Sequence, residues 1–135
     1  MKRKKTVVNW VLGTGILTLL IGIMHTVSAP MIFKAQVGKF PLLPREFLLK
    51  NVYFFAAMGS TVIFLGLLLI WTARHLRKEK SWAWLLSLAS SCFLVLLMAN
   101  AIYFKMNNLL ILLLLVGNSV NVFFLLFSRK EFTQQ

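Results

Sequence analysis

Acidic residues are nearly missing from this sequence: Glu46, Glu79 and Glu131 are the only ones among 135 residues, against 15 Lys or Arg. All charged residues together make up 13%, compared with about 25% in soluble domains. The single cysteine, Cys92, excludes a disulfide scaffold, and a 59% hydrophobic content excludes intrinsic disorder. A soluble domain of this length cannot enclose so much apolar surface. The composition therefore predicts an all-α polytopic membrane protein.

Four stretches without Lys, Arg, Asp or Glu are long enough to cross a bilayer, at residues 6–33, 51–73, 81–104 and 106–128. A hydrocarbon core of ~30 Å needs about 20 helical residues, so each stretch crosses once. Backbone groups in hydrocarbon must be paired within a helix or a closed barrel, and these runs lack the alternation of a barrel. We predict a single membrane domain, residues 1–135, with four transmembrane helices in an antiparallel bundle near 7–29, 51–73, 81–104 and 109–127.

The first predicted helix also has signal-peptide features, because a basic start precedes it and small residues end it. Its apolar run is longer than the usual h-region of about 7–15 residues. Pro30 would also follow the cleavage site directly. We therefore expect this helix to remain as a membrane anchor.

Positive charge is distributed unevenly about the predicted spans. Ten Lys or Arg lie on the side that holds both termini and the connection 74–80, and five lie on the other side. The positive-inside rule makes the richer side cytoplasmic, so both termini are expected inside the cell, in a bacterial inner membrane. Positive charges at helix ends favour anionic lipid headgroups as partners. No basic surface with interleaved aromatic residues occurs, so we expect no nucleic-acid binding.

The connection 30–50 is mostly apolar, yet it carries four Lys or Arg and all three prolines. We expect a loop lying in the outer membrane interface, with a short helix starting at Pro44, a residue favoured in first turns. The loop either covers the membrane surface or acts as a lid or docking surface for a lipid or partner.

Small and polar residues form one stripe on each predicted helix, and such stripes mark helix–helix contacts in membranes. The clearest are Gly15, Thr18, Gly22, His25, Thr26 and Ala29 in the first helix, and Ala56, Gly59, Ser60, Ile63 and Gly66 in the second. In the fourth helix, Asn118 and Asn121 are expected to join helices by hydrogen bonds or to line a polar path.

His25 is the only histidine inside a predicted span. Ionisable residues within a membrane are candidate functional residues. We predict a polar ligand-binding cluster near the outer leaflet, whose other members are Tyr53, Asn100, Arg45 and Glu46, with Asn107 and Asn108 at similar depth. Alternatively, a neutral imidazole joins two helices, or His25 ligates a metal or haem. No metal-binding spacing is present, and we predict no cofactor.

The order of features resembles the small four-helix bacterial inner-membrane proteins of the DoxX type. The resemblance is carried by GIMHT at residues 22–26, the connection that follows, and FFAAMG at residues 54–59. It implies the four-helix architecture. Some proteins of this type are linked to redox maturation, but this chain lacks the paired cysteines that such chemistry requires.

Taken together, these features predict a non-enzymatic accessory or ligand-binding subunit that contacts a larger membrane protein or its own copies. The alternatives are a homo-oligomeric transporter or lipid-handling protein, and an intramembrane enzyme that acts on a lipid or quinone with His25 as the base. No Asp or Glu lies in any predicted span, which argues against proton-coupled export.

Overall fold

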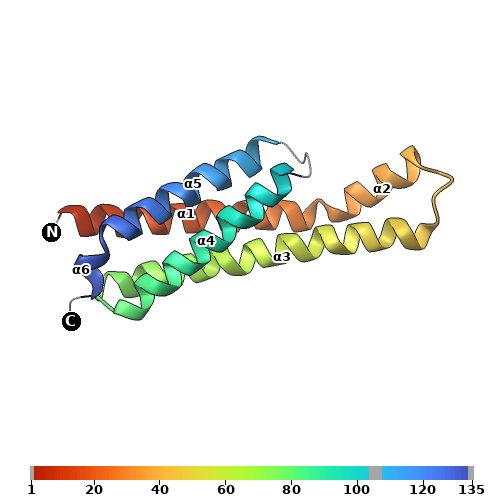
Figure 1. Ribbon diagram of the computed structural model, residues 1–135. Coiled ribbons are helices and arrows are strands. Elements are labelled where there is room, and N and C mark those ends of the chain that lie inside the picture. The colour runs from red at the N-terminus through yellow and green to blue at the C-terminus, as the bar shows by residue number, and fades with distance from the viewer. Residues whose placement is uncertain (1, 104–107, 134–135) are drawn as a thin grey trace.

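The computed structural model describes residues 2–103 and 108–133, and these residues form helices with no strand. The helices are α1 (Lys2–Val27), α2 (Ala29–Lys39), α3 (Arg45–Leu76), α4 (Ser81–Tyr103), α5 (Leu109–Phe127) and the short α6 (Arg129–Thr133) (Figure 1). Four of them, α1, α3, α4 and α5, are long and apolar enough to cross a membrane, which confirms the predicted number of candidate spans.

The four long helices contact one another in the cyclic order α1, α3, α4 and α5, and the most extensive contact joins α1 to α3. Both termini and the α3–α4 turn lie at one end of the molecule (Figure 1). We call this end the basic end. At the other end, α2 continues the direction of α1 and returns through residues 40–44 into α3. We call α2, residues 40–44 and the first turns of α3 the hairpin.

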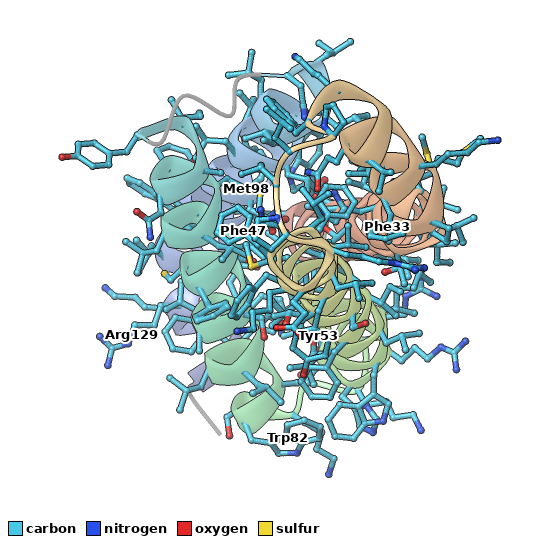
Figure 2. The ribbon with its side chains drawn as sticks, turned by 90° about the vertical axis from the view of Figure 1, so that its right-hand side faces the viewer. Phe33, Phe47, Tyr53, Trp82, Met98 and Arg129 are labelled. Atoms are coloured by element: carbon cyan, nitrogen blue, oxygen red, sulfur yellow. The ribbon has the colours of Figure 1, made fainter. Side chains whose placement is uncertain are left out.

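The hairpin extends past α4 and α5 because the helices differ in length. At 1.5 Å per residue, the 32 residues of α3 reach about 48 Å, whereas the 19 residues of α5 reach about 29 Å. Figure 2 looks onto the hairpin, with α4 and α5 on the left and α2 above the start of α3. Helix α2 packs mainly against α3, with a smaller contact to α1.

Glycine residues bring the backbones of α1 and α3 together. A Cβ atom added to Gly22 would lie 2.6 Å from the backbone nitrogen of Ile63, and one added to Gly66 would lie 2.5 Å from that of Leu19. Gly15 and Gly59 face similarly close neighbours on the opposite helix. Only glycine permits such an approach, which maximises van der Waals contact where water supplies no hydrophobic driving force. The predicted contact role of these four glycines is confirmed.

The expected loop over 30–50 is wrong for most of its length, because residues 29–39 form α2 and α3 already begins at Arg45. Pro30 occupies the first turn of α2, where its missing N–H is not needed. Pro44 is the N-cap of α3, so the expected helix start at Pro44 is close, but the helix is 32 residues long rather than short. Only residues 40–44 connect the two helices.

The other helix ends differ less from the prediction. Helix α1 begins at Lys2 and ends at Val27, α3 ends at Leu76, and α5 has the predicted bounds. The basic residues before Val7 and after Ala73 continue the helices because Lys and Arg are good helix formers. Helix α4 ends at Tyr103 in the described residues, and the predicted last residue of the third span, Phe104, lies outside them.

Candidate functional site

A cavity of about 740 Å³ lies where the hairpin passes the ends of α4 and α5. Its walls come from α1 and α2 on one side, α3 on the second, and α4 and α5 on the third. This volume is within the range of about 300–1,000 Å³ that is usual for ligand sites. The residues that line it are Ile21, Met24, His25, Ser28, Ile32, Gln36, Asn51, Phe54, Phe55, Met58, Val62, Met98, Ala101, Asn108, Leu110, Ile111 and Leu114.

Most of the cavity wall is apolar. Three methionines contribute to it, Met24 from α1, Met58 from α3 and Met98 from α4. Methionine side chains are unbranched and adapt to irregular partners. None of the described residues in the lining is an Asp, Glu, Lys or Arg. The site therefore offers a flexible hydrocarbon surface without a fixed charge.

A small polar group interrupts this surface: His25, Ser28, Gln36, Asn51 and Asn108. Two of its members are already engaged. The hydroxyl of Ser28 donates to the carbonyl of His25 at 2.9 Å, and the side-chain oxygen of Asn108 caps α5 by accepting from the backbone N–H of Ile111 at 2.9 Å. Both side chains thus complete helix ends that border the cavity.

The imidazole of His25 lies flat against a phenyl ring. The ring centroids of His25 and Phe55 are 3.5 Å apart, with planes inclined by 22°. His25 comes from the end of α1 and Phe55 from the N-terminal third of α3, so the stacking joins the two helices. It holds the imidazole at the cavity wall.

Gln36 has the clearest unmet bonding capacity in the cavity. Its Oε1 atom is buried and has no hydrogen-bond partner among the described residues. A buried acceptor without a donor costs about 1–3 kcal/mol. Such atoms are rare in folded proteins and call for an explanation such as a bound water or ligand. A rotation of the Gln36 side chain toward the cavity would let a molecule with a hydroxyl or N–H group donate to this atom.

The predicted polar cluster is brought together only in part. His25 lines the cavity, and so does Asn108. Tyr53 is 70% exposed and does not line the cavity, although it precedes the lining residue Phe54. Asn100 on α4, and Arg45 and Glu46 in the first turn of α3, are also exposed and lie outside the lining. Asn107 lies outside the described residues.

Gln36 and Asn51 line the cavity together with His25, and neither is among the residues predicted for the site. The expected loop over 30–50 conceals Gln36, because residues three or four apart share a face only within a helix. Positions 25, 28, 32 and 36 are spaced by three, four and four residues, and this spacing places them on one face of a helix. Asn51 is the first residue of a predicted span, and that position does not indicate the direction of its side chain.

The two asparagines of α5 are fully buried in the interior, away from the cavity lining. The amide of Asn121 donates to Ser91 on α4 at 3.5 Å, and Asn121 Oδ1 accepts from Thr14 on α1 at 3.5 Å. The amide of Asn118 instead donates to Leu114 in its own helix at 2.9 Å, and Asn118 Oδ1 has no partner among the described residues. Among the described residues, Asn121 therefore forms hydrogen bonds to other helices, whereas Asn118 forms one only within α5.

The fold and the composition define a helical protein with four candidate membrane-spanning helices, which indicates a multi-pass membrane protein. No protein-family model, curated protein or solved structure matches the chain. The resemblance to DoxX-type proteins stays a prediction. The site is therefore interpreted from its own residues.

Proposed function

We propose that this chain is a membrane-embedded lipid-binding subunit whose cavity holds a neutral amphiphile near the outer leaflet. The observation that carries the proposal is the combination of an uncharged, mostly apolar cavity with an unpartnered buried acceptor, Gln36 Oε1, among the described residues. The apolar wall suits acyl or prenyl chains. The acceptor suits a headgroup with a hydrogen-bond donor, as in a diacylglycerol or a long-chain alcohol.

The proposed orientation places four antiparallel crossings in a bacterial inner membrane, with both termini cytoplasmic. In the sequence, ten Lys or Arg flank the predicted span ends on the side of the termini and five flank the opposite ends, and the positive-inside rule associates the richer side with the cytoplasm. The cavity then opens toward the outer leaflet. Single cysteines in a Cys92→Ser background test this: a membrane-impermeant maleimide should label Leu42→Cys in intact cells, but Lys80→Cys only after permeabilisation. The reverse pattern would refute the orientation.

The binding proposal is tested with a diacylglycerol that carries a photoactivatable diazirine on one acyl chain. The purified full chain in lipid nanodiscs should be labelled at buried residues of the cavity lining, such as Val62, Met98 and Leu114, as read by peptide mass spectrometry. Ala101→Trp places a large ring in the cavity and should reduce this labelling at least about tenfold, because loss of about 1.4 kcal/mol of binding is tenfold.

Leu96→Trp is the matched control, because Leu96 is on the same helix but is 69% exposed on the outer surface of the molecule. It should leave cavity labelling unchanged. Equal labelling in both variants, or labelling confined to exposed residues in the wild type, would exclude a lipid site in the cavity.

The contribution of the polar group is tested separately with Gln36→Leu. This change removes the unpartnered acceptor, so the protein should become no less stable while labelling by the diacylglycerol probe falls several-fold. A probe of the same chain length whose hydroxyl is methylated cannot donate to Gln36 Oε1, and it should bind the wild type and the variant equally. If the variant loses stability and retains labelling, Gln36 has a packing role instead.

A further inference from the structure

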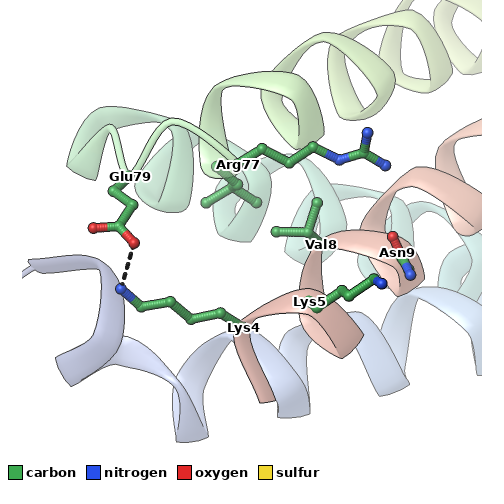
Figure 3. A pocket seen from close by; sticks show the side chains of 7 residues that line it. Lys4, Lys5, Val8, Asn9, Arg77 and Glu79 are labelled. Atoms are coloured by element: carbon green, nitrogen blue, oxygen red, sulfur yellow. Dashed lines mark hydrogen bonds and ion pairs between the residues drawn. The ribbon is translucent and has the colours of Figure 1, made fainter. Parts of the chain in front are cut away.

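A second cleft, of about 430 Å³, lies at the basic end between the start of α1 and the end of α3. It is lined by Lys4, Lys5, Val8, Asn9, Leu76, Arg77 and Glu79 (Figure 3). Val8 and Leu76 are buried and form an apolar floor. The side chains of Lys5 and Arg77 approach the same space from the two helices, with Asn9 beside them (Figure 3).

An ion pair on one side of the cleft fixes its shape. Lys4 Nζ lies 2.8 Å from Glu79 Oε1, so the start of α1 is tied to the α3–α4 turn. Glu79 has a backbone φ of 58°, in the left-handed region. The N–H groups of Glu79 and Lys80 donate to the carbonyls of Leu76 and His75 at 3.1 and 3.2 Å. This is the Schellman pattern, in which glycine is the usual left-handed residue.

The ion pair neutralises Lys4 and leaves two positive charges in the cleft. The side chains of Lys5 and Arg77 have no carboxylate or hydrogen-bond partner among the described residues. The cleft therefore suits an oxyanion that is attached to a less polar group. The two cations and the side-chain amide complement the oxyanion, and the apolar floor complements the group attached to it. Arg supplies a planar fork for phosphate oxygens and Lys supplies a mobile charge.

We propose that this cleft binds a phosphate group, with Lys5 and Arg77 as its charged ligands, Asn9 as a neutral donor and the Lys4–Glu79 pair as the element that positions them. The phosphate belongs either to the headgroup of an anionic phospholipid or to a free phosphate compound. Headgroup phosphates lie at the ends of membrane-spanning helices, where this cleft opens. The proposal is independent of the lipid cavity at the hairpin end.

The test uses the purified, delipidated full chain. Native mass spectrometry compares how much phosphatidylglycerol and how much phosphatidylcholine the protein retains. A melting experiment compares the stabilisation by inorganic phosphate with that by sodium chloride at equal ionic strength. Lys5→Gln combined with Arg77→Gln should weaken phosphatidylglycerol binding about tenfold. The matched control, Lys78→Gln with Lys80→Gln, removes the same charge from two residues of the same turn that do not line the cleft. It should change binding less than about twofold.

The outcomes separate the two sources of phosphate. Stabilisation by phosphatidylglycerol alone identifies a lipid headgroup, and stabilisation by inorganic phosphate alone identifies a soluble ligand. Equal losses in both double variants would show diffuse surface attraction and overturn the site, as would a wild type that responds to neither ligand. If the Lys5 and Arg77 variant does not fold, Asn9→Asp adds a repelling charge while the cations stay in place. It should then weaken binding, and unchanged binding would overturn the proposal.

Discussion

The basic half and the hairpin half of the molecule are packed differently, although the same helices α1 and α3 run through both. The basic half holds a cluster of twelve buried apolar residues, whereas the corresponding cluster toward the hairpin has four. Polar groups in the basic half are also paired between helices. Ser87 Oγ donates to Thr72 Oγ1, and Trp84 Nε1 donates to the carbonyl of Leu125, each at 2.8 Å.

The difference has a geometric cause. In the basic half all four long helices are present at each level, and their side chains fill the interior. Toward the hairpin, α4 and α5 end while α1, α2 and α3 continue, so apolar side chains face space instead of another helix. A ligand cavity thus arises from unequal helix length, without any loss of packing where the helices are complete.

The largest expected effect concerns the α1–α3 contact on which both halves depend. Gly22→Leu forces a side chain into the backbone of Ile63, and the helices cannot separate without losing their whole contact. We expect a loss of about 3 kcal/mol or more in the free energy of unfolding, measured by titration with a denaturing detergent. Gly13→Leu is the control, because a Cβ at Gly13 meets nothing within 4 Å. If both substitutions are tolerated equally, the close approach of the backbones is not needed.

The comparison of the two halves is tested directly by one substitution at two positions of α4. Ala83 is fully buried in the basic half, whereas Ala101 lines the cavity. Ala83→Leu should cost about 2 kcal/mol of unfolding free energy through overpacking. Ala101→Leu should change it by less than about 0.5 kcal/mol, since the new methyl groups enter open space. Equal losses in the same detergent titration would mean that the cavity is filled by protein.

The asparagines of α5 should respond in opposite directions. Asn121→Leu removes hydrogen bonds to α1 and α4 and should lower the free energy of unfolding by about 0.6–1 kcal/mol. Asn118→Leu removes one hydrogen bond within its own helix, but also a buried acceptor that has no partner among the described residues, so it should leave stability unchanged or raise it. A loss for Asn118→Leu as large as that for Asn121→Leu would indicate that a water or ion normally binds Asn118 Oδ1.

The number of long helices and the α1–α3 contact were predictable, because both depend on local features of the sequence. Runs without charge define the helices, and the seven-residue spacing of Gly15 and Gly22 matches that of Gly59 and Gly66. Each pair lies on one side of its helix, which predicts a close contact there, and the structure shows that the two glycine faces contact each other.

The candidate site was less predictable, because depth in the membrane was inferred but the direction of each side chain was not. Tyr53 and Phe55 are two residues apart and therefore point about 200° apart on a helix, so only Phe55 meets His25. Gln36 was hidden by the expectation that a segment with three prolines nearby would be a loop. Pro30 is compatible with a helix because it occupies the first turn of α2.

The smallest expected effect concerns the turn that closes the basic half. A left-handed residue other than glycine costs about 1 kcal/mol, and the partly exposed Lys4–Glu79 pair offsets less than about 1 kcal/mol of this. Glu79→Gly removes both contributions, so stability should stay within about 0.5 kcal/mol of the wild type. Glu79→Ala keeps the backbone cost but loses the ion pair, and it should be less stable than the wild type by about 0.5 kcal/mol.

Salt and the detergent titration together separate the two contributions at this turn. High salt should shrink the stability difference between the wild type and the Glu79→Ala variant, because it screens exposed charges. It should leave the difference between the Glu79→Gly and Glu79→Ala variants unchanged, since neither has a carboxylate at this position. If Glu79→Gly is instead less stable than Glu79→Ala, the left-handed backbone at residue 79 carries no cost that glycine relieves, and the ion pair with Lys4 is the main contribution of Glu79 to the turn.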